Sequence, residues 1–192
     1  MNYVALLRGI NVGGKNMLPM RDLAQMFAKA GCTNVQTYIQ SGNVIFSANR
    51  ALAEKVPSVI AKKIAGQFGY TVPVVLRSAD EVGDIIQNNP FLKAGARKER
   101  DGARGDKALT PEDMLHVYFL ASLPQTRDVA ALDPARSLPD TFVVRGREVY
   151  VHLPNGMART KLSNAWFDSK LATISTARNW RTVLKLFELT QG

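Results

Sequence analysis

The chain has 192 residues, of which 46% are hydrophobic, and its 25 Lys and Arg residues against 16 Asp and Glu residues give a net charge of +9. This length supports one large or two small domains with real hydrophobic cores. The single cysteine, Cys32, excludes an intramolecular disulfide, no Cys/His cluster has metal-ligand spacing, and no apolar run approaches the roughly 18 residues that span a bilayer. We therefore expect a cytoplasmic protein with no cofactor, no metal and no membrane contact.

The first residues predict a strand, a loop and a helix. Tyr3–Arg8 is a short apolar run typical of a buried strand, and Gly9–Asn16 is a loop rich in glycine and asparagine. Pro19 suits the first turn of a helix, apolar residues then recur at i, i+3, i+4 and i+7, and Gly31 supplies the stop.

A hairpin and a second helix are predicted next. The strands Val35–Ile39 and Val44–Ser47 flank Gln40–Asn43, whose Ser-Gly-Asn sequence is typical of a tight turn. Apolar residues spaced four apart then predict a helix that ends near Gly69. We expect Pro57 to kink this helix or to delay its start.

A fourth strand, Val72–Arg77, completes the order β-α-β-β-α-β of ferredoxin-like folds. We therefore predict an α/β (α+β) protein whose residues 1–88 form a ferredoxin-like domain that closes on a short helix, Ala79–Asn88. Residues 89–113 carry eleven charges with no apolar period, which indicates a mobile connection between domains.

The second half, residues 114–192, has a similar order of elements. Its predicted elements are a strand at Leu115–Ala121, a helix near Gln125–Leu132, a hairpin of Thr141–Val144 with Glu148–Leu153, and helices at about Lys161–Leu171 and Arg178–Leu189. The second half thus repeats the order strand, helix, hairpin, helix of the first half, but it lacks a final strand. The shared order predicts an internal duplication of the ferredoxin-like plan.

Two polar loops of the first half are candidates for a ligand site. The first two strands of the unit run parallel, so the loops that follow them leave the same edge of the sheet, beside the first helix N-terminus, where free N–H groups favour an anion. The candidate ligands are Asn11, Gly13, Gly14, Lys15, Asn16, Gln40, Ser41, Gly42 and Asn43. The alternative is that the glycines make tight turns whose Asn and Ser side chains bind their own backbone.

The first loop also nearly matches the phosphate-binding pattern G-x-x-x-x-G-K-[ST], because Gly9 and Gly14-Lys15 have that spacing after a strand. Asn16 replaces the hydroxyl residue that would hold Mg²⁺, and Pro19 places the helix start several residues beyond Lys15. These departures argue against a nucleoside-triphosphate hydrolase.

A second candidate segment is basic and lies near the C-terminus. Its candidate ligands are Arg159, Lys161, Ser163, Asn164, Arg178, Asn179 and Arg181. Several of these cations lie at the predicted helix N-termini, where the helix dipole disfavours positive charge. We therefore expect an anion or a carboxylate to neutralise them. A solvated helix face is the alternative, and capping by Thr176 or Ser163 explains the hydroxyl groups without a ligand. Trp180 is predicted to lie in the core.

Whether the protein is an enzyme stays open, because no established catalytic motif is present. His116 and His152 lie in predicted strands, where a lone histidine is usually structural. Asp168 is the one acid beside the basic segment to test as a general base.

Three motifs together resemble a known family. They are Ala5–Asn16 (ALLRGINVGGKN), Thr37–Val44 (TYIQSGNV) and Thr176–Thr182 (TARNWRT), and their order is similar to that of the bacterial domain of unknown function 1697 family over nearly the whole chain. The resemblance implies a fold of ferredoxin-like units. It implies no established activity, cofactor or catalytic residue.

The leading hypothesis is therefore a binding protein in which the two loops and the basic segment converge on one pocket for a small phosphorylated or carboxylated ligand. Nucleic-acid binding is the second hypothesis, with Tyr38 and Phe46 as the candidates for base stacking. An enzyme of unidentified reaction is the third. The oligomeric state does not follow from the sequence.

Overall fold

The computed structural model describes residues 1–93 and 110–192. They form two units: unit 1 comprises Met1–Asp84 and Leu184–Gly192, and unit 2 comprises Ile85–Val183. The last nine residues thus belong with the N-terminal half, and the helices α3 (Ala79–Gln87) and α8 (Trp180–Gln191) are each divided between the units. No helix in the described part of the chain has the length and apolar character needed to cross a membrane.

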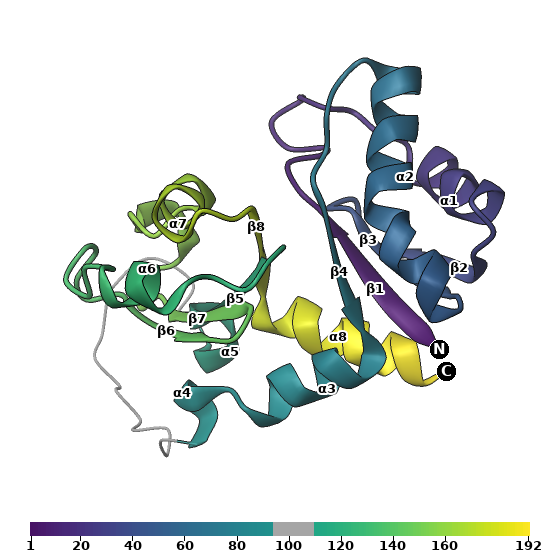
Figure 1. The fold of residues 1–192 in the computed structure, drawn as a ribbon. Helices are drawn as coiled ribbons and strands as arrows, with labels where there is room; N and C mark the ends of the chain where they lie inside the picture. The colour runs from purple at the N-terminus through teal and green to yellow at the C-terminus, as the bar shows by residue number, and fades with distance from the viewer. Residues whose placement is uncertain (94–109) are drawn as a thin grey trace. The chain divides into compact units, whose positions relative to one another are not determined.

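Unit 1 has the predicted ferredoxin-like fold. Its elements are β1 (Asn2–Leu7), α1 (Met20–Lys29), β2 (Thr33–Tyr38), β3 (Asn43–Ser47), α2 (Arg50–Phe68) and β4 (Val74–Ser78), followed by the first part of α3. The four strands form an antiparallel sheet in the order β2-β3-β1-β4. Helices α1 and α2 cover one face of this sheet (Figure 1).

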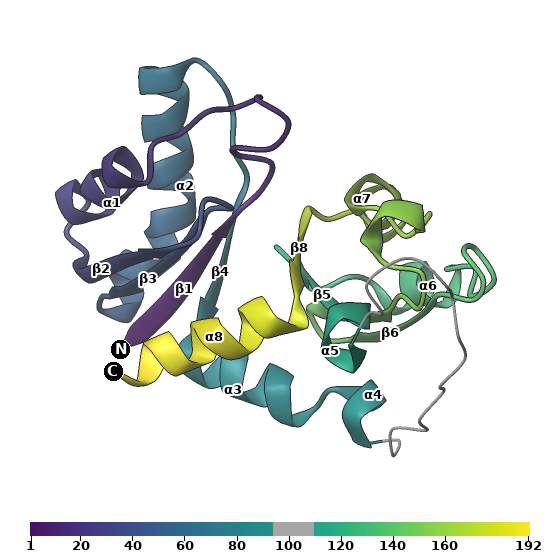
Figure 2. The same ribbon diagram turned by 180° about the vertical axis from the view of Figure 1, so that it is seen from behind.

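Strand β1 is buried on both of its faces, which explains why it is continuously apolar. Tyr3, Ala5 and Leu7 belong to the core cluster that includes residues of α1 and α2, such as Phe27. Val4 and Leu6 alternate with them on the other face and are each only 1% exposed. The terminal segments of unit 1 are also joined, because the Asn2 side chain donates a 2.7 Å hydrogen bond to the Thr190 carbonyl at the end of α8. Figure 2 shows the two termini side by side.

Helix α2 begins seven residues before Pro57, so the predicted delay of its start is wrong. The Asn49 side chain caps the helix by accepting the Leu52 N–H at 2.8 Å, which fixes the start independently of the proline. The end lies where the sequence predicts it, since Gly69 adopts a left-handed conformation with φ of 76°.

Unit 2 repeats the plan completely. Its strands and short helices are α4 (Pro90–Lys93), α5 (Pro111–Met114), β5 (Leu115–Leu120), α6 (Thr126–Ala130), β6 (Thr141–Arg145), β7 (Glu148–His152), the 3₁₀ turn Met157–Arg159, α7 (Asn164–Leu171) and β8 (Ser175–Asn179). The sheet order is β6-β7-β5-β8, with β8 antiparallel to β5. The predicted absence of a fourth strand is therefore wrong. Residues 94–109 of the predicted connection lie outside the described residues.

The strand β8 escaped prediction because its sequence, STARN, has polar residues at both ends and runs directly into α8. Its burial comes from pairing with β5, a contact that has no local sequence signature. As a result Thr176 and Arg178, predicted at a helix start, lie in a strand, and the last helix begins at Trp180, which is 2% exposed as expected.

The two fourth strands share a detail that the order of elements alone does not require. Arg77 in β4 lies opposite Val4 of β1, and Arg178 in β8 lies opposite Val117 of β5. Both side chains are buried, at 0% and 8% exposure, and each donates a 2.7 Å hydrogen bond to the carbonyl of the residue before it. The two halves thus share an equivalent buried arginine as well as a topology.

His116 in β5 predicts a pH dependence of stability. Its Nδ1 atom is buried without a hydrogen-bond partner in the described structure, and burial lowers the pKa of the imidazole, although the Met114 backbone and the Asp113 carboxylate act in the opposite direction. The unfolded chain therefore binds a proton at a higher pH than the folded chain. The contribution of His116 to the free energy of unfolding is fully present above the pKa of the imidazole in the unfolded chain, about 6.5. It is lost as the pH falls toward the lower pKa of the imidazole in the folded chain.

We expect the free energy of unfolding of the wild type to fall between pH 7.5 and pH 5.5 more steeply than that of His116→Gln, by at most about 1.4 kcal/mol per pH unit. Urea unfolding at both pH values measures the difference, in which the contributions of carboxylates that do not interact with His116 cancel. Equal slopes for the two proteins would contradict this prediction.

Candidate functional site

The first polar loop is a tight hairpin. The Asn11 N–H donates to the Asn16 carbonyl at 3.2 Å, and the Lys15 N–H donates to the Val12 carbonyl at 3.0 Å. Gly13 and Gly14 at the tip have φ of 57° and 72°, and positive φ at both central residues is the signature of a type I′ turn. The glycines are thus needed for the turn itself.

Asn11 joins this hairpin to the second loop. Its side-chain amide donates to the Leu18 carbonyl at 3.0 Å and to the Gln40 carbonyl at 2.9 Å, while its oxygen accepts the Leu18 N–H at 2.7 Å. The two loops therefore leave the same edge of the sheet and touch, as the parallel arrangement of β1 and β2 predicts.

Most polar groups of the second loop are used within the loop. The Asn43 side chain is fully buried and donates to the Tyr38 carbonyl at 3.1 Å and to the Ser41 hydroxyl at 3.0 Å. A Cβ atom on Gly42 would lie 2.7 Å from Leu7 Cβ, so this glycine is required by packing. Such contacts are what the tight-turn alternative expects. Lys15, Gly13, Gly14 and Gln40 remain exposed at the surface.

The first loop does not have the structure of a phosphate-binding loop. The Asn16 side chain donates to the Gly9 carbonyl at 2.9 Å, and α1 begins only at Met20, after the capping residue Pro19. The loop therefore does not lead Lys15 directly into a helix N-terminus, as the phosphate-binding pattern requires.

The predicted basic segment lies in unit 2, and its polar residues have local partners. Ser163 caps α7 by accepting the Trp166 N–H at 3.2 Å, and the Asn164 side chain donates to the Ser175 hydroxyl at 2.9 Å. Asn179 accepts the Thr182 N–H at 2.8 Å and so takes the capping role that the sequence suggested for Thr176.

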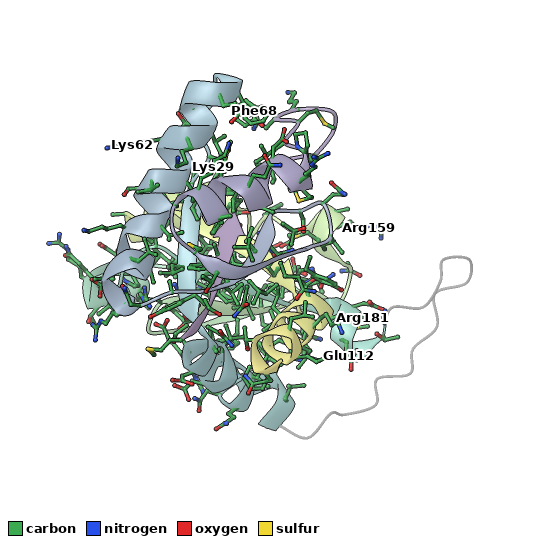
Figure 3. The ribbon with its side chains drawn as sticks, turned by 90° about the vertical axis from the view of Figure 1, so that its right-hand side faces the viewer. Lys29, Lys62, Phe68, Glu112, Arg159 and Arg181 are labelled. Atoms are coloured by element: carbon green, nitrogen blue, oxygen red, sulfur yellow. The ribbon has the colours of Figure 1, made fainter. Side chains whose placement is uncertain are left out.

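The two arginines of the last motif have different environments. Arg178 is buried, and burial lowers the pKa of its guanidinium to about 10. Arg181 is half exposed, and its guanidinium lies 3.6 Å from a Glu112 oxygen and 3.2 Å from an Asp113 oxygen; Figure 3 shows it beside Glu112. We expected a carboxylate or an anion to neutralise these cations. For Arg181 the structure supplies carboxylates.

Arg159 and Lys161 are exposed, and neither forms an ion pair with a residue that the structure describes. The Lys161 backbone N–H donates to the Ser137 hydroxyl at 2.9 Å, which holds the segment in place. Asp168, the candidate general base, accepts both the N–H and the hydroxyl of Ser175, at 2.8 and 2.6 Å. These contacts give Asp168 a structural role at the start of β8.

Of the two aromatic candidates for base stacking, Phe46 lies in the core, whereas Tyr38 is half-buried and stays a prediction. Phe46 is fully buried, with its ring centroid 5.7 Å from that of Tyr3 and 5.2 Å from that of Phe27. Its ring faces the core beneath α1 and cannot receive a base.

A groove of about 330 Å³ lies between α1 and α2, in a place that the sequence did not single out. One helical stripe from each helix lines it: Asp22, Gln25, Met26 and Lys29 from α1, and Lys63, Gly66 and Gln67 from α2. The spacings i, i+3, i+4 and i+7 in α1, and i, i+3 and i+4 in α2, place each set on one face. Met26, 4% exposed, forms part of the floor.

The groove is polar, and the two helices that line it are basic. Helices α1 and α2 together carry six Lys and Arg residues and two Asp and Glu residues. Lys29 and Lys63 form no ion pair with any described residue, whereas Arg50 pairs with Glu54 at 2.9 Å. Figure 3 shows Lys29 on α1 and Lys62 projecting outward from α2.

One signal could have revealed the groove from the sequence. Gly66 lies inside α2, where glycine costs about 1 kcal/mol relative to alanine, and a Cβ atom built on it meets nothing within 4 Å. Neither backbone conformation nor packing requires this glycine. A glycine inside a predicted helix is therefore a local feature of the sequence that sets this position of the groove apart.

Comparison with known proteins places the chain in context. The family described as "Protein of unknown function (DUF1697)" matches residues 1–150, whereas no curated protein matches. Among solved structures, the conserved bacterial protein SP0830 from Streptococcus pneumoniae is similar, with a TM-score of 0.61, 21% identity and 98% of each chain covered. At this identity the likeness concerns the fold.

Proposed function

This chain belongs to the DUF1697 family, and for this member we propose that unit 1 binds a small anionic ligand in the groove between α1 and α2. The observation that carries the proposal is the pair Lys29 and Lys63, two ammonium groups that line one groove and form no ion pair within the described structure. A phosphate or carboxylate between them would be neutralised by both lysines.

The remaining lining residues restrict the ligand further. Asp22 and Lys29 are seven residues apart on α1, which is about 10 Å along the helix axis. A ligand that spans the groove would therefore place its anionic group near the lysines and an amine or hydroxyl group near Asp22. Gln25 and Gln67 offer amide donors and acceptors along its length.

Thermal-shift measurements with inorganic phosphate, citrate, phosphoserine, glucosamine 6-phosphate and a short RNA test this proposal. We expect one of the small anions to stabilise the wild type, by about 2.7 kcal/mol at 100 times its Kd. Lys63→Gln and Lys29→Gln should each reduce the shift, because each removes one of the two charges. Gly66→Leu should abolish it by filling the groove.

The matched control is Lys62→Gln, which removes the same charge from the neighbouring position of α2 but does not touch the groove. We expect it to retain the small-anion shift. Equal losses in Lys62→Gln and Lys63→Gln, with RNA as the stabilising probe and strong salt dependence, would instead indicate nucleic acid on the basic face. No shift with any probe would contradict the proposal.

A further inference from the structure

Three large apolar side chains are exposed at the loop edge of unit 1. Val12, Met17 and Ile39 are 66%, 61% and 51% exposed, and Lys15 lies between the first two in sequence. We call these four residues the loop platform. Single exposed apolar residues are common, but a group of them held together on one edge marks an interaction site.

The contacts of Asn11 hold the platform together. Val12 directly follows Asn11, Met17 directly precedes Leu18, and Ile39 directly precedes Gln40; the Asn11 side chain binds the backbone of both Leu18 and Gln40. The Tyr70 hydroxyl also donates to the Met17 carbonyl at 2.8 Å. These hydrogen bonds constrain the backbone beside the platform residues without a partner, which lowers the entropic cost of binding.

Ile39 is unfavourable for the fold in two respects. Its φ is 49°, in the left-handed region where a β-branched residue is strained, and half of its side chain is exposed to water. An Asn or Gly would suit this backbone better. Packing within unit 1 covers only about half of this residue, and a partner would cover the rest.

The charge of the platform selects the kind of partner. Residues 8–19 contain Arg8 and Lys15 and no acid, and residues 39–43 contain no charge. The apolar side chains of the platform complement apolar side chains of a partner, and the Lys15 ammonium group complements an acidic one. A membrane surface needs more basic residues than two, and base stacking needs aromatic tips.

We propose that the loop platform docks a short segment of a partner protein that carries apolar side chains beside an Asp or Glu. The apolar side chains cover Val12, Met17 and Ile39, and the carboxylate pairs with Lys15. This surface is distinct from the residues that line the α1–α2 groove, so the two proposals succeed or fail separately.

The test is selection of a displayed library of random twelve-residue peptides on the wild-type protein, followed by affinity measurement of one enriched peptide by fluorescence anisotropy. We expect enriched peptides to combine Asp or Glu with large apolar residues. The double variant Val12→Ser/Met17→Ser and the variant Lys15→Glu should each weaken binding at least tenfold. Leu123→Ser, which replaces a 69% exposed leucine of unit 2, should not change it.

Ile39→Asn separates binding from folding. Because Asn tolerates the left-handed backbone, we expect its melting temperature to equal or exceed that of the wild type while peptide affinity falls several-fold. The proposal is overturned if no peptide distinguishes wild type from the double variant, or if enriched peptides lack acids. It is also overturned if vesicles of phosphatidylcholine and phosphatidylglycerol, and not peptides, bind through the platform.

Discussion

Gly42→Ala is expected to destabilise the protein by about 2–5 kcal/mol. The φ of Gly42 is 77°, which costs an L-residue about 1–2 kcal/mol. The new Cβ would also lie 2.7 Å from Leu7 Cβ and 2.9 Å from Ile10 Cδ1, and overpacking of this kind costs about 1–3 kcal/mol. Both neighbours are at most 1% exposed, and Leu7 Cβ is bonded directly to the backbone, so relief of that contact requires a backbone shift. Urea unfolding of the purified variant measures the loss.

Two other glycines serve as controls with different expected outcomes. Gly13→Ala shares the positive φ but meets nothing within 4 Å, so only the backbone cost of about 1–2 kcal/mol should appear. Gly66→Ala has neither problem and should stabilise α2 by about 1 kcal/mol. If Gly42→Ala costs no more than Gly13→Ala, the close contacts with Leu7 and Ile10 do not determine the need for glycine.

Asn11→Gly is the second substitution for which we expect a large effect, a loss of about 2–4 kcal/mol. Glycine accepts the φ of 55° at this position, so the change removes the side chain without adding backbone strain. Three hydrogen bonds of 2.7–3.0 Å are lost, each worth about 1 kcal/mol, and the N–H of Leu18, a residue only 1% exposed, is left without its partner.

The comparison variant is Asn16→Gly, which also keeps a positive φ, here 49°. It removes a single exposed hydrogen bond, from the Asn16 side chain to the Gly9 carbonyl, and should cost about 1 kcal/mol or less. Amide hydrogen exchange should show that Asn11→Gly also loses protection at Leu18. Equal stability of the two variants would mean that Asn11 does not hold the two loops together.

The first half of the fold was predictable because its signals are local. The apolar run of β1, the helix stop at Gly69 and the turn between β2 and β3 each depend on a few neighbouring residues. The second half was predicted less completely, since β8 is a polar strand whose assignment depends on its pairing with β5. Helix boundaries near Lys161 and Arg178 shifted because Ser163 and Asn179 act as the caps.

The candidate site shows the same division. The sequence placed the two polar loops at one edge, and the contact between Asn11 and Gln40 agrees with that placement. It did not separate side chains that bind their own loop, such as Asn43, from those that face solvent, such as Lys15. That distinction depends on the direction of each side chain, which composition and spacing do not encode.

The sequence by itself determined the order of elements in unit 1, the turn positions and the basic character of the chain, because backbone preference and charge are properties of individual residues. Only the tertiary structure decided that Lys29 and Lys63 line one groove, that carboxylates answer Arg181, and that Val12, Met17 and Ile39 gather at one edge. Each of these is a juxtaposition of residues from different segments. It depends on packing between elements. The physical reason is that burial and strand pairing depend on which residues are close in space, and such residues can be far apart in the sequence.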